Sequence, residues 1–178
     1  MMANSETSPR VIVGRQEIEA TVSRLAGEIG RDYHDKCPVL LGILKGSFVF
    51  VADLVRHLEF PLEVEFMRLS SYGHGTASSG KVKVVPGLLP AVRGREVLVV
   101  EDIVDTGLTV SFLLEYLRKK EPASLRLCAL TDKPSRRRVP VTIDYLGFSV
   151  PDKFLVGYGL DCDEKFRNLP DICALECD

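Results

Sequence analysis

The chain has 178 residues, 46% of them hydrophobic and 27% charged, which suits one soluble α/β domain and excludes two full-sized ones. Its 23 basic and 25 acidic residues nearly cancel, so charge gives no general reason to expect a nucleic-acid or membrane partner. The N-terminal stretch MMANSETSPR has no apolar signal core, and no apolar run approaches the roughly 18 residues of a membrane span, so we expect a cytoplasmic protein.

Helices and strands alternate along the first part of the chain. Apolar residues recur at helical spacing over residues 14–33, and the continuous apolar run 38–44 is typical of a buried parallel strand. Helical spacing returns over 47–58, and a second strand is expected over 62–72. The small, polar, Gly-rich residues 73–80 that follow predict a mobile loop.

The second part of the chain continues the alternation. Residues 96–101 have the apolar heart of a central strand, residues 108–120 a helical pattern, and residues 124–131 another strand pattern. Late strands are expected over 141–143 and 154–158. The alternation predicts an α/β fold with a mostly parallel twisted sheet flanked by helices.

The most informative segment is residues 97–109, VLVVEDIVDTGLT, in which an apolar strand runs into acidic residues and then opens a helix. A helix N-terminus at the carboxyl end of a parallel strand offers free N–H groups to a phosphate. Thr106 and Thr109 add hydroxyl donors, and Gly107 allows close approach of the backbone. This pattern predicts a phosphate site.

Three acids stand beside that phosphate site and would repel the ligand unless they bind something else. Glu101 and Asp102 could accept hydrogen bonds from a vicinal diol such as a ribose, and Asp105 could act as a base. A phosphorylated sugar satisfies these demands together. The simpler alternative is an acidic cluster in which Asp105 only caps the helix and the other two acids are solvated.

The segment closely resembles the phosphoribosyl-pyrophosphate signature of type I phosphoribosyltransferases, and its EDIVDTG wording is similar to their hypoxanthine-guanine branch. The resemblance extends over residues 11–175. It implies one domain, residues 1–178, with a core of about 35–150, a small hood from 11–20 and 151–178, and a flexible β-ribbon loop at 70–82. The matching stretches are Leu44–Gly46, Arg68–Tyr72, Lys133, Val150–Asp161 and Arg167–Leu169.

The resemblance implies a role for each matching residue on the sugar side. Glu101 and Asp102 would hold the ribose hydroxyls, and Asp105 would be the catalytic base for the purine ring proton. The 5′-phosphate would be held by the loop residues Asp105, Thr106, Gly107, Leu108 and Thr109.

On the purine side, the resemblance implies that Lys133 contacts the 6-oxo oxygen, Phe154 stacks on the ring, and Leu155 contributes backbone groups. Asp161 belongs to the same purine-binding segment and would also contact Mg²⁺. The resemblance makes Glu101 and Asp102 metal ligands as well, because Mg²⁺ prefers a few carboxylates plus phosphates.

The resemblance further implies that Lys45, Gly46 and Arg167 bind pyrophosphate, with a cis peptide bond in the Leu44–Gly46 turn. Ser71 and Tyr72 would form a lid that keeps water from the reacting sugar.

The resemblance thus implies a Mg²⁺-dependent purine-salvage enzyme that converts hypoxanthine or guanine and phosphoribosyl pyrophosphate to IMP or GMP and pyrophosphate. Relatives suggest a homodimer or homotetramer without nucleic-acid or membrane partners. Two alternatives remain: a xanthine or uracil enzyme, and an RNA-binding pyrimidine-operon attenuator of the same fold. The attenuator needs a basic face, and residues 133–138, KPSRRR, are the one basic run, which is usually a solvated turn.

Overall fold

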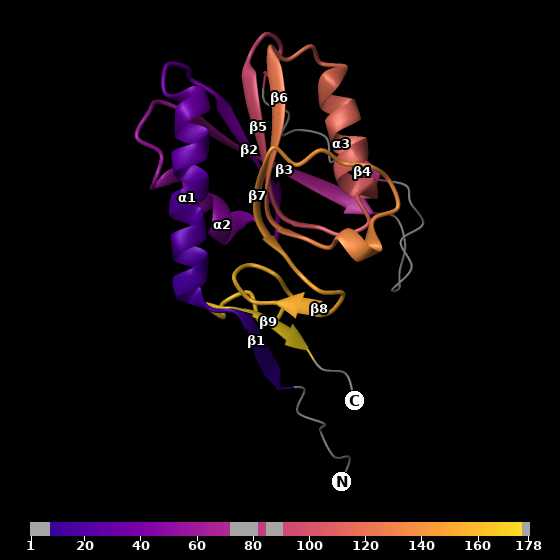
Figure 1. Cartoon of the computed structure of the whole chain (residues 1–178). Coiled ribbons are helices and arrows are strands. Elements are labelled where there is room, and N and C mark those ends of the chain that lie inside the picture. The colour runs from indigo at the N-terminus through magenta and orange to yellow at the C-terminus, as the bar shows by residue number, and fades with distance from the viewer. Residues whose placement is uncertain (1–7, 72–81, 85–90, 176–178) are drawn as a thin grey trace.

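A six-stranded sheet forms the centre of the molecule (Figure 1). The computed structural model describes residues 8–71, 82–84 and 91–175. All neighbouring strands of this sheet are parallel except β3 and β4, which are antiparallel. The predicted fold class is confirmed. The strand order is β4 (Val82–Val84), β3 (Glu63–Ser71), β2 (Val39–Leu44), β5 (Glu96–Val104), β6 (Ser124–Asp132), β7 (Tyr145–Ser149).

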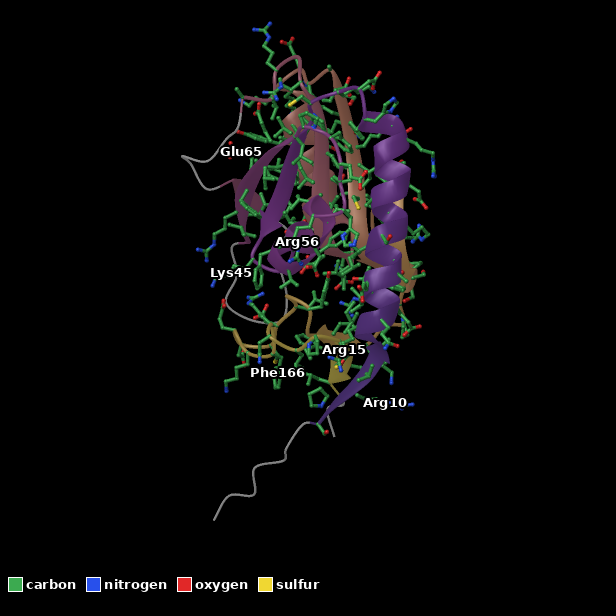
Figure 2. The ribbon with its side chains drawn as sticks, turned by 90° about the vertical axis from the view of Figure 1, so that its left-hand side faces the viewer. Arg10, Arg15, Lys45, Arg56, Glu65 and Phe166 are labelled. Atoms are coloured by element: carbon green, nitrogen blue, oxygen red, sulfur yellow. The ribbon has the colours of Figure 1, made fainter. Side chains whose placement is uncertain are left out.

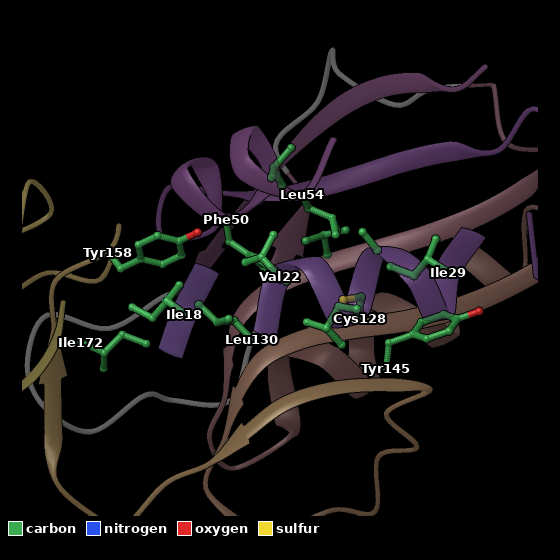
Figure 3. Packing of buried hydrophobic residues seen from close by; sticks show 14 of the residues in the cluster. Ile18, Val22, Ile29, Phe50, Leu54, Cys128, Leu130, Tyr145, Tyr158 and Ile172 are labelled. Atoms are coloured by element: carbon green, nitrogen blue, oxygen red, sulfur yellow. The ribbon is translucent and has the colours of Figure 1, made fainter. Parts of the chain in front are cut away.

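Helices cover both faces of this sheet. α1 (Arg15–Tyr33) and α2 (Phe48–Val55) lie on one face and α3 (Leu108–Arg118) on the other (Figure 1). Because side chains alternate along a strand, β5 sends Leu98 and Val100 into the α1 and α2 cluster and Val97 and Val99 into the α3 cluster. Figure 3 shows the first cluster, in which Ile18, Val22 and Phe50 lie close to Leu130 and Cys128.

A second, smaller sheet lies beyond the carboxyl edge of the large one (Figure 1). It consists of β1 (Pro9–Val13), β9 (Ile172–Leu175) and β8 (Phe154–Val156), all antiparallel. We call this sheet with the segment 157–171 the hood. A loop of the hood comes very near the large sheet, because a Cβ on Gly159 would lie 2.1 Å from the Gly46 carbonyl oxygen.

One predicted strand is wrong. Residues 141–143 form no strand, and β7 begins only at Tyr145. Val141 and Ile143 are apolar because they pack on the α3 cluster from an irregular segment. Asp144 then joins that segment to β6 by two hydrogen bonds with Leu127. The Asp144 amide donates to the Leu127 carbonyl oxygen, and the Leu127 amide donates to the Asp144 carboxylate.

Two further sequence expectations concern the predicted loop and a membrane span. Residues 72–81, which include most of the predicted loop and Tyr72, lie outside the described residues. None of the described helices is long and apolar enough to cross a membrane.

Candidate active site

Three parallel strands end at one edge of the large sheet and bring the predicted residues together. β2 ends at Leu44, and the following Leu44–Lys45 peptide bond is cis, as the sequence predicted. β5 runs through the acid pair to Val104, which lies opposite Asp132 at the end of β6. Lys133 follows at once, so the turn after β2, the acid pair and this lysine share the carboxyl edge.

The acid pair is buried rather than solvated. Asp102 is 7% exposed and Glu101 is half-buried, with its Oε2 atom buried and unpaired among the described residues. Burial and the neighbouring Asp102 raise the pKa of Glu101 well above its ordinary value. Burial likewise raises the pKa of Asp102 to about 6. The pair therefore shares a low-dielectric site that favours a proton or a cation.

The backbone fixes Asp102 tightly in this place. Its Oδ1 atom accepts a hydrogen bond from the Ile103 amide at 2.9 Å, and the Thr131 hydroxyl donates to its carbonyl oxygen at 2.8 Å. Gly46 packs directly on its carboxylate, because a Cβ at that position would lie 1.7 Å from Asp102 Oδ2. Only glycine fits between the acid pair and the hood.

The loop from Asp105 to Thr109, which we call the phosphate loop, has free amides. Gly107 takes the left-handed conformation, with φ of +84°, and precedes the first residue of α3. Leu108 N–H makes a long 3.4 Å bond to the Thr106 hydroxyl. Within the described part of the chain, the amides of Thr106 and Gly107 have no acceptor. Free amides at a helix N-terminus favour an anion.

Lys133 is buried, although a lone lysine at such a position is usually a surface residue. It is 6% exposed, and burial lowers its pKa while the nearby Asp105 carboxylate opposes that change. Arg136 Nε contacts Asp105 Oδ1 at 2.7 Å. Phe154 is 53% exposed, whereas the following Leu155 is buried. The exposed Phe154 ring offers an apolar face to a ligand, and the buried Lys133 ammonium offers a hydrogen-bond donor.

A carboxylate lies between the two basic side chains that are predicted to bind pyrophosphate. Glu164 contacts Lys45 Nζ at 2.9 Å and Arg167 at 3.2 Å, and these two bonds lower the pKa of Glu164. Arg167 also pairs with Asp161 at 2.8 Å, and its buried Nε atom has no partner among the described residues. Figure 2 shows Lys45 between the main sheet and the hood segment that carries Phe166.

Sequence reasoning missed four residues of this site, Asp132, Arg136, Arg137 and Glu164. The arginines lie in the basic run that we expect to be a solvated turn, and this holds for Arg136 and Arg138, which are exposed, but not for Arg137. Arg137 is only 19% exposed and contacts Asp132, while Arg136 contacts Asp105 and Asp152. The sequence signal that could have found this pair is Asp132 at the end of a predicted strand, five residues before Arg137. Two of the three arginines in the basic run are therefore paired with acids, while Arg138 is exposed.

A cavity of about 580 Å³ lies elsewhere, between α1, α2 and the hood. Of the predicted site residues, only Arg167 lines it. Apolar Ile18, Val22 and Val49 form part of its wall, and the acid pair does not contribute. We therefore build the site on the convergent polar groups and not on this cavity.

Comparison with known proteins agrees with this geometry. The phosphoribosyl transferase domain family matches residues 12–163, so fold and site together define a phosphoribosyltransferase. The hypoxanthine-guanine phosphoribosyltransferase of Bacillus subtilis is 45% identical over 94% of this chain and 93% of its own length. The hypoxanthine phosphoribosyltransferase of Salmonella typhimurium is 46% identical over 90% of this chain and 91% of its own.

A solved structure gives the same result. The hypoxanthine-guanine phosphoribosyltransferase of Bacillus anthracis superposes with a TM-score of 0.88 at 43% identity, covering 93% of this chain and 98% of the other. The chain belongs to the hypoxanthine-guanine phosphoribosyltransferase family.

The contact between Gly46 and Asp102 predicts a specific defect. Gly46→Ala should displace the Asp102 carboxylate or the turn after β2, destabilise the fold by about 1–3 kcal/mol, and lower activity at least about tenfold. Gly30→Ala is the control, because a Cβ there meets nothing within 4 Å in α1 and should be neutral or slightly stabilising. Urea unfolding and initial rates measure both; full activity in Gly46→Ala would contradict the contact.

The raised pKa of Asp102 predicts a pH dependence of stability. In the folded state its pKa is about 6, above the ordinary value near 3.9, so the folded protein binds more protons between about pH 4 and 6. This contribution is therefore fully present at low pH and is lost as the pH rises through 6. Asp102→Asn lacks it.

The unfolding free energy of Asp102→Asn, relative to the natural chain, should thus rise by about 2–3 kcal/mol from pH 4 to pH 7. Urea unfolding at each pH, without added divalent cation, measures this difference. A difference that is constant with pH would show that Asp102 ionises normally in the folded protein.

Proposed function

We propose that this enzyme transfers the phosphoribosyl group to a 6-oxopurine, hypoxanthine or guanine, with release of pyrophosphate. The observation that carries the proposal is the meeting of a buried acid pair and the free amides of the phosphate loop at one sheet edge. A ligand that suits both must carry a phosphate and a vicinal diol close together. Ribose 5-phosphate meets that requirement, and family membership supplies the reaction.

On the sugar side, the proposal assigns the ribose hydroxyls to Glu101 and Asp102 and the 5′-phosphate to the phosphate loop. The unpaired Glu101 Oε2 atom is an acceptor that a hydroxyl can satisfy. The Thr106 and Gly107 amides supply donors without a competing protein acceptor in the described chain. Thr109 is exposed at the start of α3, where its hydroxyl can reach the same phosphate.

On the purine side, the buried Lys133 ammonium would donate to the 6-oxo oxygen, with Phe154 stacked on the ring and backbone groups of Leu155 and Asp161 completing the pocket. A buried cation without an acceptor is costly, so the pocket should reject a base with an amino group at this position. The same reasoning supports an oxopurine over adenine. It does not depend on which oxopurine is preferred.

The proposal assigns the role of catalytic base to Asp105. The glycosidic bond forms as a purine ring nitrogen attacks the anomeric carbon and the bond from that carbon to pyrophosphate breaks. The ring proton must leave, and the proposal sends it to the Asp105 carboxylate. Arg136 contacts the Oδ1 atom of this carboxylate at 2.7 Å, but that atom makes no well-directed hydrogen bond with the described residues.

Lys45, the Gly46 backbone and Arg167 would hold the pyrophosphate, which would take the place of the Glu164 carboxylate between the two cations. The proposal assigns Mg²⁺ to the pyrophosphate together with Glu101, Asp102 and Asp161, because Mg²⁺ prefers a few carboxylates plus phosphate oxygens. Among the described residues, no group of three acidic, His or Cys side chains could hold the ion without such a ligand. When bound, Mg²⁺ would neutralise charge on the leaving pyrophosphate.

Four expectations stay predictions from the sequence. The lid role of Ser71 and Tyr72 falls at residues whose side chains lie outside the described part. The cytoplasmic location and the homodimer or homotetramer rest on the same footing, as does the division into core and hood.

The first test is the reaction itself. Purified protein with phosphoribosyl pyrophosphate, Mg²⁺ and hypoxanthine or guanine should form IMP or GMP, whereas adenine should react at least about 10²-fold more slowly. Chromatography of the nucleotide products measures all three reactions. Absence of product from both oxopurines would refute the proposal.

The second test concerns the base. Asp105→Asn keeps the shape of the side chain but removes its basicity, so kcat should fall by about 10²–10⁴-fold while the KM for phosphoribosyl pyrophosphate changes little. Asp152→Asn is the matched control, since Asp152 also contacts Arg136 but lies outside the proposed site. If Asp105→Asn turns over normally, another group takes the proton.

A further inference from the structure

The turn that follows β6 packs against the back of the phosphate loop. The amides of Arg138 and Val139 both donate to the Thr106 carbonyl oxygen, at 2.9 and 3.4 Å. Gly107 lies under the same turn, because a Cβ on it would come within 2.9 Å of the Val139 carbonyl oxygen. The turn and the phosphate loop are therefore one packed unit, although 30 residues or so separate them in sequence.

Arg137 is the side chain that ties this unit together. Its Nη1 atom donates to the carbonyl oxygen of Asp105 at 2.8 Å, and its Nη2 atom pairs closely with the Asp132 carboxylate. The Arg137 and Asp132 side chains are only 19% and 12% exposed. Partial burial strengthens such charge-assisted bonds and protects them from screening by salt.

Asp132 is itself held by the sheet. It is the last residue of β6, opposite Val104, and its carbonyl oxygen accepts a 2.8 Å bond from the Val150 amide. The Lys133 amide donates to the Val104 carbonyl at 3.0 Å. The chain of contacts thus runs from the rigid sheet through Asp132 and Arg137 to the Asp105 carbonyl.

The direction of that carbonyl determines where the loop amides point. A loop that binds phosphate must turn its N–H groups toward the ligand and its C=O groups away from it. Arg137 and the two turn amides engage the carbonyls of Asp105 and Thr106 on the side of the turn. The amides of Thr106 and Gly107, which have no acceptor in the described chain, are left for a ligand.

We propose that Arg137, oriented by Asp132, is a positioning residue that holds the phosphate loop in its ligand-binding form. The inference rests on the proposed function, since it takes the loop's ligand to be the 5′-phosphate. Arg137 itself does not touch substrate. It acts on affinity for the sugar phosphate and leaves affinity for the purine largely unchanged.

The guanidinium group is required for a geometric reason. Two acceptors of different kinds, a backbone carbonyl and a carboxylate, are bound by two different nitrogens of one planar group. A lysine ammonium is a single point donor on a flexible stem and cannot hold both acceptors at fixed directions. Arg137→Lys should therefore restore part of the function and Arg137→Gln very little.

The next residue supplies a matched control. Arg138 is exposed, and its contact with the phosphate loop is made by its backbone amide, which any substitution except proline retains. Arg138→Gln thus changes the charge of the turn by the same amount as Arg137→Gln and keeps the hydrogen bonds to the loop.

The experiment measures the KM for each substrate and, by calorimetry with Mg²⁺, the Kd for phosphoribosyl pyrophosphate. Arg137→Gln should raise both constants for phosphoribosyl pyrophosphate by about tenfold or more, the usual effect of losing a hydrogen bond to a charged group. The KM for hypoxanthine should change less than about threefold, and Arg138→Gln should behave like the natural chain. Arg137→Lys should fall between them.

Asp132→Asn provides a second route to the same result and carries the test if Arg137→Gln does not fold, as judged by circular dichroism and thermal unfolding. Its effect should resemble that of Arg137→Gln, and the double variant should be no worse than the single ones, because both changes break one linkage. Independent, additive effects would overturn the proposal.

Two other outcomes decide the matter. A folded Arg137→Gln whose constants for phosphoribosyl pyrophosphate equal those of the natural chain, or whose two substrate KM values rise equally, would overturn the positioning role. Failure of the natural chain to bind phosphoribosyl pyrophosphate would instead refute the proposed function. The control measurement on the natural chain therefore separates the two failures.

Discussion

Burial of two adjacent carboxyl groups at the end of the central strand is the constraint around which the site is built. Burial raises the pKa of both Glu101 and Asp102. Among the neighbouring cations only Arg167 opposes this rise, and its effect on Asp102 is small. Gly46 must lack a side chain because the Asp102 carboxylate fills that space, and Gly159 must let the hood approach Gly46. A polar ligand or cation that meets these acids would relieve the cost of burying them.

The same sheet edge also carries free amides, which favour an anion, and the course of the backbone separates them from the acids. The acids occupy the end of β5 itself, whereas the free amides occur after the chain has turned through Gly107 into α3. The support for that turn comes from the next strand, β6, and the segment that follows it. Groups that repel an anion and groups that attract one thus lie on neighbouring elements.

The elements that could be predicted from the sequence are those whose pattern is contained in a short stretch of the chain. The buried strands β2 and β5 and the helix after Gly107 follow from short apolar patterns, and the family motif correctly implied the cis bond at Leu44–Lys45. The hood strands β1 and β9 could not be predicted as partners, because they pair across most of the chain length. Val141 and Ile143 gave a strand pattern for a different reason, namely packing from an irregular segment.

The candidate site shows the same limit. A lysine and a run of arginines suggest surface by composition, yet Lys133 is buried and Arg137 is engaged by Asp132, an acid five residues away. The sequence holds both partners of that pair but not the turn that brings them together. The roles inferred for Phe154, Asp161 and the other residues that we expect to bind substrate stay predictions.

The Glu164 carboxylate between Lys45 and Arg167 has one more consequence. If pyrophosphate binds there, it replaces the Glu164 carboxylate as the partner of Lys45 and Arg167 and does not bind to two unpaired cations. Chloride or a single phosphate gains little by such an exchange, because it must compete with a tethered carboxylate whose local concentration is high. A diphosphate brings more charge over a longer span, so the tethered side chain acts as a threshold that discriminates among inorganic anions by their size and charge.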